Sequence, residues 1–382
     1  MGDTDSAETY DAAVIGGGLA GLSLSILLAK SGYRVALLEK EKYPFHKVCG
    51  EYISLESWDF IESLGLPLHT MNLPMIKKLL VTSPSGKKIE SDLDLGGFGI
   101  SRYLLDSELS KIARLSGVKI FEQTKINDII FADDIFTISA PGFKIRSALA
   151  AGCFGKRSNL DIKWMRPFVK KKQGKLNNYI GVKYHVQSGF EADTIALHNF
   201  ENGYCGISRI EEDKYCLCYL TTANNLSASN NSIEAMEKNI LQKNPFLKKI
   251  FKESVFLLRS PVTISQISFS EKSQVDHHVL MAGDAAGMIT PLCGNGMSMA
   301  LHAAKIAFEC IDRYLQNKIT RSAMEKEYIR KWNNQFKKRL RNGRIIQSFF
   351  GKEWLTNTFI TILKYFPFVT RSLIRSTHGK PF

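Results

Sequence analysis

The fold of this chain is decided by the stretch Ala12-Ala13-Val14-Ile15-Gly16-Gly17-Gly18-Leu19-Ala20-Gly21, which runs from an apolar strand into a helix. The turn between them has the pattern Gly-x-Gly-x-x-Gly. In such a unit the first glycine permits a tight turn, the second lets the backbone approach a pyrophosphate, and the third lets helix and strand pack closely. The N-terminus of the helix also directs free N–H groups at the phosphates. The stretch therefore predicts a dinucleotide-binding site.

A second apolar strand, expected at residues 34–38, ends in Glu39, which lies 21 residues after Gly18. At this distance a carboxylate can accept hydrogen bonds from the ribose hydroxyls of a dinucleotide. Lys40 follows directly and is expected at the same end of the cofactor.

A matching pattern lies far downstream. A buried-type strand at 279–282 leads into Gly283-Asp284, then into the loop 291–297, and then into a helix expected from about 298 to 315. The Asp284 carboxylate can bind a ribityl hydroxyl. The turn from Gly294 to Gly296 lets backbone N–H groups at a helix N-terminus face the pyrimidine edge of a flavin, where negative charge collects on reduction. The two patterns together predict bound FAD.

These stretches resemble the FAD-dependent oxidoreductases of the para-hydroxybenzoate hydroxylase and geranylgeranyl reductase superfamily, over residues 11 to about 315. Two further segments carry the resemblance. Residues 44–51 read Pro-Phe-His-Lys-Val-Cys-Gly-Glu, similar to the PxxKxCG of the reductase branch, and Arg102 stands in Ser-Arg-x-x-Leu-Asp. The resemblance implies that Lys47, Cys49 and Gly50 lie close to the flavin and that Arg102 contacts the cofactor. The expected cofactor-binding residues are Gly16, Gly18, Leu19, Ala20, Gly21, Glu39, Lys40, Lys47, Cys49, Gly50, Arg102, Gly283, Asp284, Pro291, Gly294, Asn295, Gly296 and Met297.

The expected fold class is α/β, with three regions in the chain. A Rossmann-type FAD-binding domain of glutathione-reductase-like topology takes residues 1–75, 101–160 and 271–315. A β-rich substrate domain, inserted at 76–100 and 161–270, carries a hairpin over 81–89 and strands at 180–186, 194–200, 204–209 and 215–220. A basic, apolar helical appendage is expected at 316–382.

The seven cysteines, odd in number and scattered, indicate neither a disulfide framework nor a metal site, and the chain opens with acidic residues rather than an apolar leader. We therefore expect a cytoplasmic protein. Residues 313–382 carry sixteen Lys and Arg against three Glu, so they hold almost all of the net charge of +14. A basic helix over 320–348 is followed by an aromatic stretch whose apolar runs are too short to span a bilayer. Two interpretations stay open: peripheral contact with an anionic membrane at its inner face, or a helical pair packed on the body. No nucleic-acid partner is expected, because no nucleic-acid module is recognisable.

Two departures from the resembled families bear on the reaction. The hydroxylases usually have an Asp-Gly pair where this chain has Ala151-Gly152, and the reductases usually have a YxWxFP-type stretch where this chain has residues 203–210. The WxWxIP signature of tryptophan halogenases is also absent. Since no second GxGxxG is present, NADPH or NADH is considered only as a transient electron donor.

Three hypotheses follow, with monooxygenation of a bulky apolar or aromatic substrate in the lead. The rival is saturation of isoprenoid or polyene double bonds, and the third is a membrane-associated flavin-binding protein without catalysis. Cys49 is the candidate catalytic residue, against the alternative that it is a small buried hydrophobe. His46 is expected to be a solvent-exposed loop residue rather than a proton donor.

Overall fold

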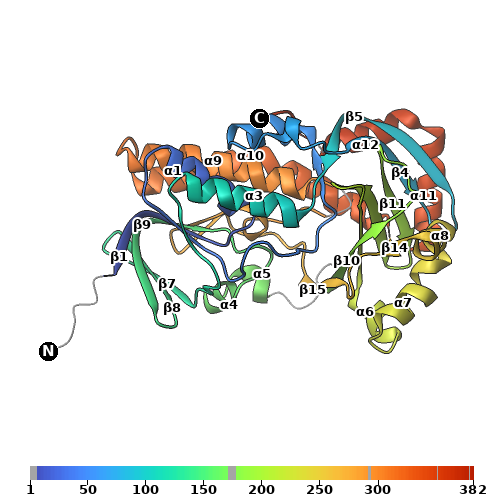
Figure 1. Ribbon diagram of the computed structural model, residues 1–382, viewed down its shortest axis with the longest axis horizontal. Helices are drawn as coiled ribbons and strands as arrows, with labels where there is room; N and C mark the ends of the chain where they lie inside the picture. The colour runs from blue at the N-terminus through green and yellow to red at the C-terminus, as the bar shows by residue number, and fades with distance from the viewer. Residues whose placement is uncertain (1–6, 171–177, 291–293, 351, 378) are drawn as a thin grey trace.

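A computed structural model describes residues 7–170, 178–290, 294–350, 352–377 and 379–382. It shows a mixed α/β protein with two sheets and a layer of C-terminal helices (Figure 1), which confirms the predicted fold class.

The first sheet is a parallel core with a short antiparallel edge strand and a hairpin. Its order is β16 (Val275–Asp276), β17 (Val279–Met281), β9 (Phe143–Gly152), β1 (Glu8–Ile15), β2 (Val35–Leu38) and β6 (Lys119–Phe121). The hairpin of β7 (Asp128–Ala132) and β8 (Ile135–Ala140) continues from β9. All four residues of β2 are buried, as expected of a parallel strand covered on both faces.

Helices α1 (Leu19–Lys30), α3 (Arg102–Leu115) and α9 (Gly296–Leu315) pack side by side against the first sheet (Figure 1). Helix α1 is apolar almost all round, and nine of its twelve residues are buried. Because β1 leads directly into α1, the glycine-rich turn lies at the carboxyl end of the parallel strands, where α/β sheets bind ligands.

The second sheet joins two segments that are distant in the chain. Its order is β14 (Val255–Phe256), β10 (Tyr179–Gln187), β13 (Tyr215–Thr222), β12 (Gly203–Arg209), β11 (Thr194–Phe200), β4 (Met75–Thr82), β5 (Lys88–Gly99) and β3 (Tyr52–Ser54), with β15 (Val262–Ile267) paired to β10. The parallel pair of β4 and β11 links the two segments. The predicted hairpin over 81–89 is present, closed by a hydrogen bond of 2.8 Å from the Ser83 N–H to the Lys87 carbonyl. Strand β3 differs from the expectation: it lies before residue 76 yet pairs with β5.

Helices α7 (Ile233–Asn239) and α8 (Pro245–Glu253) cover one face of the second sheet, burying Met236, Leu247 and Ile250 against its strands. Shorter helices connect these parts, namely α2 (Trp58–Ser63), α4 (Asn159–Lys163), α5 (Pro167–Lys170) and α6 (Ala223–Ala228).

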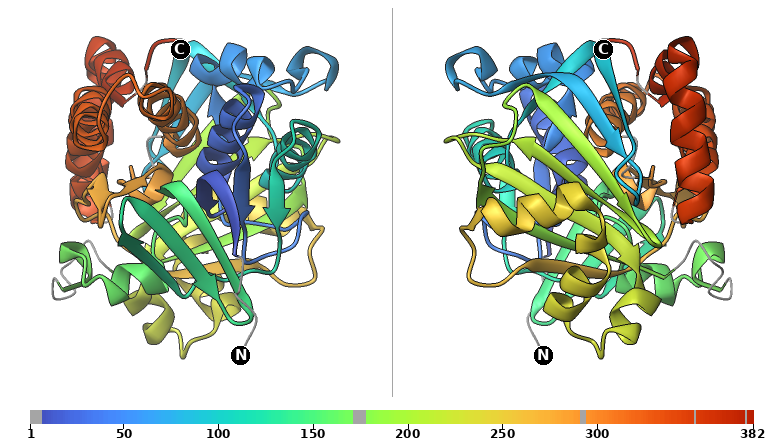
Figure 2. Two further views of the ribbon diagram at one scale, coloured as in Figure 1. Left: turned by 90° about the vertical axis from the view of Figure 1, so that its left-hand side faces the viewer. Right: turned by 90° about the vertical axis from the view of Figure 1, so that its right-hand side faces the viewer.

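The C-terminal region forms α10 (Arg321–Ser348), α11 (Glu353–Tyr365) and α12 (Pro367–Thr377), which make an outer layer on one side of the molecule (Figure 2). The stripe of Met324, Tyr328, Trp332, Phe336 and Leu340 along α10 is buried. It packs on α9 and on the loop after β17, where a Cβ at Gly287 would lie 2.9 Å from the Trp332 ring. The packing interpretation therefore describes α10, whereas α11 and α12 also present an exposed apolar face.

Candidate functional site

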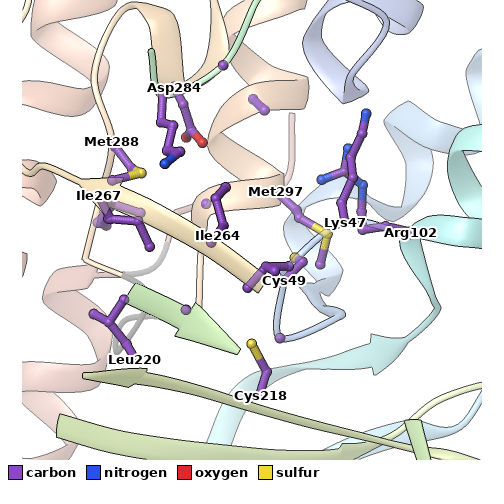
Figure 3. Close-up of a pocket in the computed structure, with 18 of the residues that line it drawn as sticks. Lys47, Cys49, Arg102, Cys218, Leu220, Ile264, Ile267, Asp284, Met288 and Met297 are labelled. Atoms are coloured by element: carbon purple, nitrogen blue, oxygen red, sulfur yellow. The ribbon is translucent and has the colours of Figure 1, made fainter. Parts of the chain in front are cut away.

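A cavity of about 1240 Å³ extends from the glycine-rich turn to the second sheet. Pockets for a single small ligand are usually about 300–1,000 Å³, so this one has room for a large cofactor and part of a substrate. In Figure 3 Lys47 and Arg102 lie on one side and Asp284 on the other, with Cys49 and Met297 between them.

The glycine-rich turn forms the wall of the cavity at the start of α1. Gly16 has φ +106°, and a Cβ there would lie 2.4 Å from the carbonyl oxygen of Cys153. A Cβ at Gly21 would lie 1.9 Å from the Gly16 carbonyl oxygen, so Gly21 serves helix packing behind the turn and does not itself line the cavity. Helix α1 has Gly18 as its N-cap and no side-chain cap. Its first N–H groups therefore face the cavity with no side-chain acceptor.

Glu39 lies beneath this turn with its side chain buried. Its carboxylate accepts hydrogen bonds from the Gly17 N–H at 2.7 Å and from the Glu41 N–H at 3.0 Å. Glu39, which the sequence predicts to bind the ribose, therefore also holds the turn in place. Both Glu39 and Lys40 line the cavity.

Two cations face the turn and share one buried carboxylate. Asp106 accepts from Arg102 Nε at 2.7 Å, from Arg102 Nη2 at 2.8 Å and from Lys47 Nζ at 2.9 Å. Burial raises the pKa of Asp106, but the two cations outweigh burial and hold that pKa below its usual value. A Cβ at Gly18 would lie 3.8 Å from Arg102 Nη2 and 3.9 Å from Lys47 Nζ. Asp106 therefore positions a double positive charge against the turn.

A second carboxylate lines the cavity with cations around it. Asp284 lines the cavity, and burial raises its pKa, opposed by the charges of Lys272, Arg102 and Lys156. Lys272 Nζ donates to the carbonyl oxygens of Lys156 at 2.6 Å and of Asp284 at 2.7 Å. Burial lowers the pKa of both lysines to about 8.

The other residues that the sequence predicts around Asp284 differ in whether the structure describes them. The cavity is lined by Gly283, Gly294, Asn295, Gly296 and Met297. Pro291 lies outside the described residues.

Cys49, Gly50 and Glu51 line the cavity in succession. Burial raises the pKa of the Cys49 thiol, which therefore keeps its proton at neutral pH. The Glu51 carboxylate is fully buried and accepts from Lys183 Nζ at 2.5 Å, from His185 Nε2 at 2.7 Å and from the Arg102 N–H at 2.8 Å.

Burial alone would raise the pKa of Glu51, but the His185 hydrogen bond and the Lys183 charge lower it below the usual value. The pKa of Lys183 is lowered by burial and raised by Glu51, and the net shift is upward. The carboxylate is therefore ionised and tied to both partners.

His46 is half-buried rather than solvent-exposed, which corrects the expectation from the sequence. Its ring stacks on Tyr103 with centroids 4.6 Å apart and meets His185 edge-on at 5.2 Å. Burial lowers the pKa of His46.

Beyond Cys49 the lining becomes apolar. Side chains from β4, β5, β11, β13 and β15 meet side chains from α11 and α12 around this half of the cavity. They include Leu79, Val81, Ile89, Ile195, Leu197, Leu220, Ile264, Ile267, Phe359, Leu363, Leu373 and Ile374.

Comparison with known proteins shows to which family the chain belongs. A family model described as an FAD binding domain matches residues 9–316. The chain belongs to this FAD-binding family. Conditioned medium factor receptor 1 of Dictyostelium discoideum is 23% identical over 79% of this chain and 63% of the relative, so the chain spans less than two thirds of that protein. Digeranylgeranylglycerophospholipid reductase of Methanococcus vannielii is 25% identical over 88% of this chain and 85% of the relative.

The solved structure of the flavin-dependent brominase Bmp2 has a similar fold, with a TM-score of 0.78 over 97% of this chain and 93% of the brominase. The sequences are 21% identical, so this similarity concerns the fold alone.

The residues that line the cavity on the polar side of Cys49 fit FAD. The uncapped start of α1 with Arg102 and Lys47 provides N–H donors and positive charge for a pyrophosphate. Glu39 and Asp284 both line the cavity, and their carboxylates have the chemistry to accept hydrogen bonds from sugar and ribityl hydroxyls. Together these residues would hold FAD within the cavity.

The sequence analysis assigned no role to three residues of the site, which are Asp106, Lys183 and His185. Asp106 ends the Ser-Arg-x-x-Leu-Asp motif, and its spacing of four from Arg102 on a helix is the signal that would have paired them. Lys183 and His185 stand two apart in an otherwise apolar strand, so both point to one face, where a buried carboxylate is needed.

Proposed function

We propose that this protein uses FAD to reduce carbon–carbon double bonds in a long apolar substrate, such as an isoprenoid or polyene chain. The observation that carries the proposal is the continuity of the cavity, which joins the FAD-binding half to a wall of aliphatic side chains. The similarity to digeranylgeranylglycerophospholipid reductase, over most of both chains, supports the same reaction class.

Reduced FAD supplies a hydride, and saturation of the double bond then needs one proton from an acid near the site. The Cys49 thiol suits this role, because burial keeps it protonated and it lines the cavity where the polar and apolar halves meet. After each turnover the Cys49 thiol would regain its proton from solvent, and an external donor would supply the two electrons that the reaction consumes. NADPH or NADH in transient contact is the donor that we propose.

Glu51 is not the acid, since it is ionised and its oxygens are engaged. It acts by position: it holds the Arg102 N–H and the segment from Cys49 to Tyr52 against the second sheet. The apolar wall excludes water from the far half and holds the substrate chain.

Monooxygenation of a bulky apolar or aromatic substrate is the second candidate. It is favoured by the segment 203–210, which lacks the YxWxFP pattern and contributes Tyr204, Gly206, Ile207 and Ser208 to the cavity. A flavin-binding protein without catalysis is the third alternative.

One anaerobic experiment separates these functions. The FAD-loaded protein is reduced with NADPH, NADH or dithionite and mixed, without oxygen, with a geranylgeranyl lipid in detergent. The proposal predicts that the visible absorbance of oxidised flavin returns and that the lipid gains pairs of hydrogen atoms. Cys49→Ala should slow this return, whereas Cys310→Ala, buried in α9, should not.

Other outcomes point elsewhere. Return of the absorbance only after oxygen is admitted, with an oxygen atom in the product, would establish monooxygenation. A flavin that dithionite reduces but NADPH and NADH do not, with no lipid product formed with or without oxygen, would support the third alternative.

A further inference from the structure

Helices α11 and α12 have an inner face that belongs to the cavity. Ile360 and Leu363 are buried in a cluster with Val81 and Ile89 of the second sheet. Leu363, with Phe359, Leu373 and Ile374, also lines the cavity. The helix pair is therefore one wall of the proposed substrate site.

The outer face of the same pair is apolar and exposed. Its large exposed side chains are Trp354, Ile362, Tyr365, Phe366 and Phe368, and Tyr365 is 75% exposed. Four of the five large exposed aromatic side chains among the described residues lie in this short segment. Trp354, Ile362 and Tyr365 follow helical spacing along one side of α11. Exposed aromatic side chains so concentrated indicate a contact surface.

Basic residues surround this patch. Lys352, Lys364 and Arg371 are exposed, Arg375 pairs with Asp94 of β5, and Glu353 is the single acidic residue of α11 and α12. No described helix is long and apolar enough to cross a membrane. Aromatic rings flanked by Lys and Arg suit the headgroup region of a bilayer, where the rings are buried and the cations meet anionic lipid.

We propose that α11 and α12 dock on an anionic membrane surface and that a lipid substrate enters the cavity beside them. The substrate class rests on the proposed function, whereas the docking surface does not. A second copy of the chain is a poorer occupant, because a two-fold contact through this face would bring two basic patches together.

Vesicle flotation tests the surface without any turnover. We expect the FAD-loaded protein to float with phosphatidylcholine vesicles that contain phosphatidylglycerol and to bind pure phosphatidylcholine vesicles much more weakly. Lys364→Glu with Arg371→Glu should weaken binding about 25-fold or more, since each basic residue near such a surface contributes about fivefold. Trp354→Ser with Phe368→Ser should lower binding to both vesicle types. Leu115→Ser, which changes an 89% exposed side chain on α3, is the matched control and should bind normally.

Trp354 fluorescence gives a second measurement. The difference in emission between the wild type and Trp354→Phe should shift to shorter wavelength when anionic vesicles are added. Unshifted emission, or equal flotation of the wild type and both double variants, would overturn the proposal. So would a dimer in sedimentation that the Trp354→Ser and Phe368→Ser pair dissociates. A wild-type protein that binds neither vesicle type but still reduces detergent-dispersed lipid would refute docking and leave the proposed reaction standing.

Discussion

Glu51→Gln is the substitution whose consequences the structure specifies most fully. The change keeps the shape of the side chain but removes the charge that compensates Lys183 and hydrogen-bonds His185, both of which are buried. Removing one partner of a buried ion pair costs about 3–5 kcal/mol, because the other charge remains unpaired in a low dielectric. Since a folded protein is stable by only about 5–15 kcal/mol, the variant should unfold at a much lower urea concentration.

A double-mutant cycle tests the cause of this loss. Lys183→Met removes the orphaned ammonium, so the double variant should recover a large part of the stability lost in Glu51→Gln. Glu90→Gln is the control, since Glu90 pairs with Lys88 where both side chains are more than half exposed, and its urea midpoint should stay close to that of the wild type. A loss below about 1 kcal/mol for Glu51→Gln, or strictly additive effects with Lys183→Met, would refute the account of this cluster.

The remaining predictions concern pH and the cofactor site. The pKa of Glu51 is lower in the folded protein than in the unfolded chain, where it is 4.5. The contribution of Glu51 to stability is therefore fully present above pH 4.5 and is lost as the pH falls through the pKa of the folded protein. Urea midpoints of the wild type should drop on acidification in this range, and those of Glu51→Gln should drop less. Asp284→Ala should weaken FAD binding about 10- to 100-fold, as expected for a lost hydrogen bond to a charged group, and an unchanged dissociation constant in a fluorescence titration would show that the ribityl contact lies elsewhere. Gly21→Ala should yield protein without flavin, because its Cβ would meet the Gly16 carbonyl oxygen, whereas Gly189→Ala, with open space around it, should yield normal yellow protein.

Local patterns predicted the fold because apolar periodicity and turn chemistry act over a few residues. The strand expected at 194–200 matches β11, and the basic helix expected over 320–348 matches α10 within one residue. The sequence predicts that the glycine-rich turn and the loop before α9 lie close together, because a single ligand must reach both. Residues of both segments line one cavity.

Contacts between residues far apart in the chain could not be predicted from the sequence. Strand β3 has three residues, and its partner β5 begins far along the chain, so its membership of the second sheet depends on tertiary contacts alone. Glu51 and Lys183 are 132 residues apart, and no spacing rule links them. The sequence also could not show that α10 packs its apolar stripe inward while α11 keeps aromatic side chains exposed, because both helices have apolar residues at helical spacing.

We infer that one FAD molecule is held jointly by the turn at Gly16–Gly21 and by the loop around Asp284. The most direct measurement is the amount of FAD released by denaturing the purified protein after incubation with excess FAD and removal of the unbound cofactor. We predict one FAD per chain for the wild type and a clear deficit for Asp284→Ala and Gly21→Ala alike. A colourless wild-type protein that takes up no FAD would contradict the account.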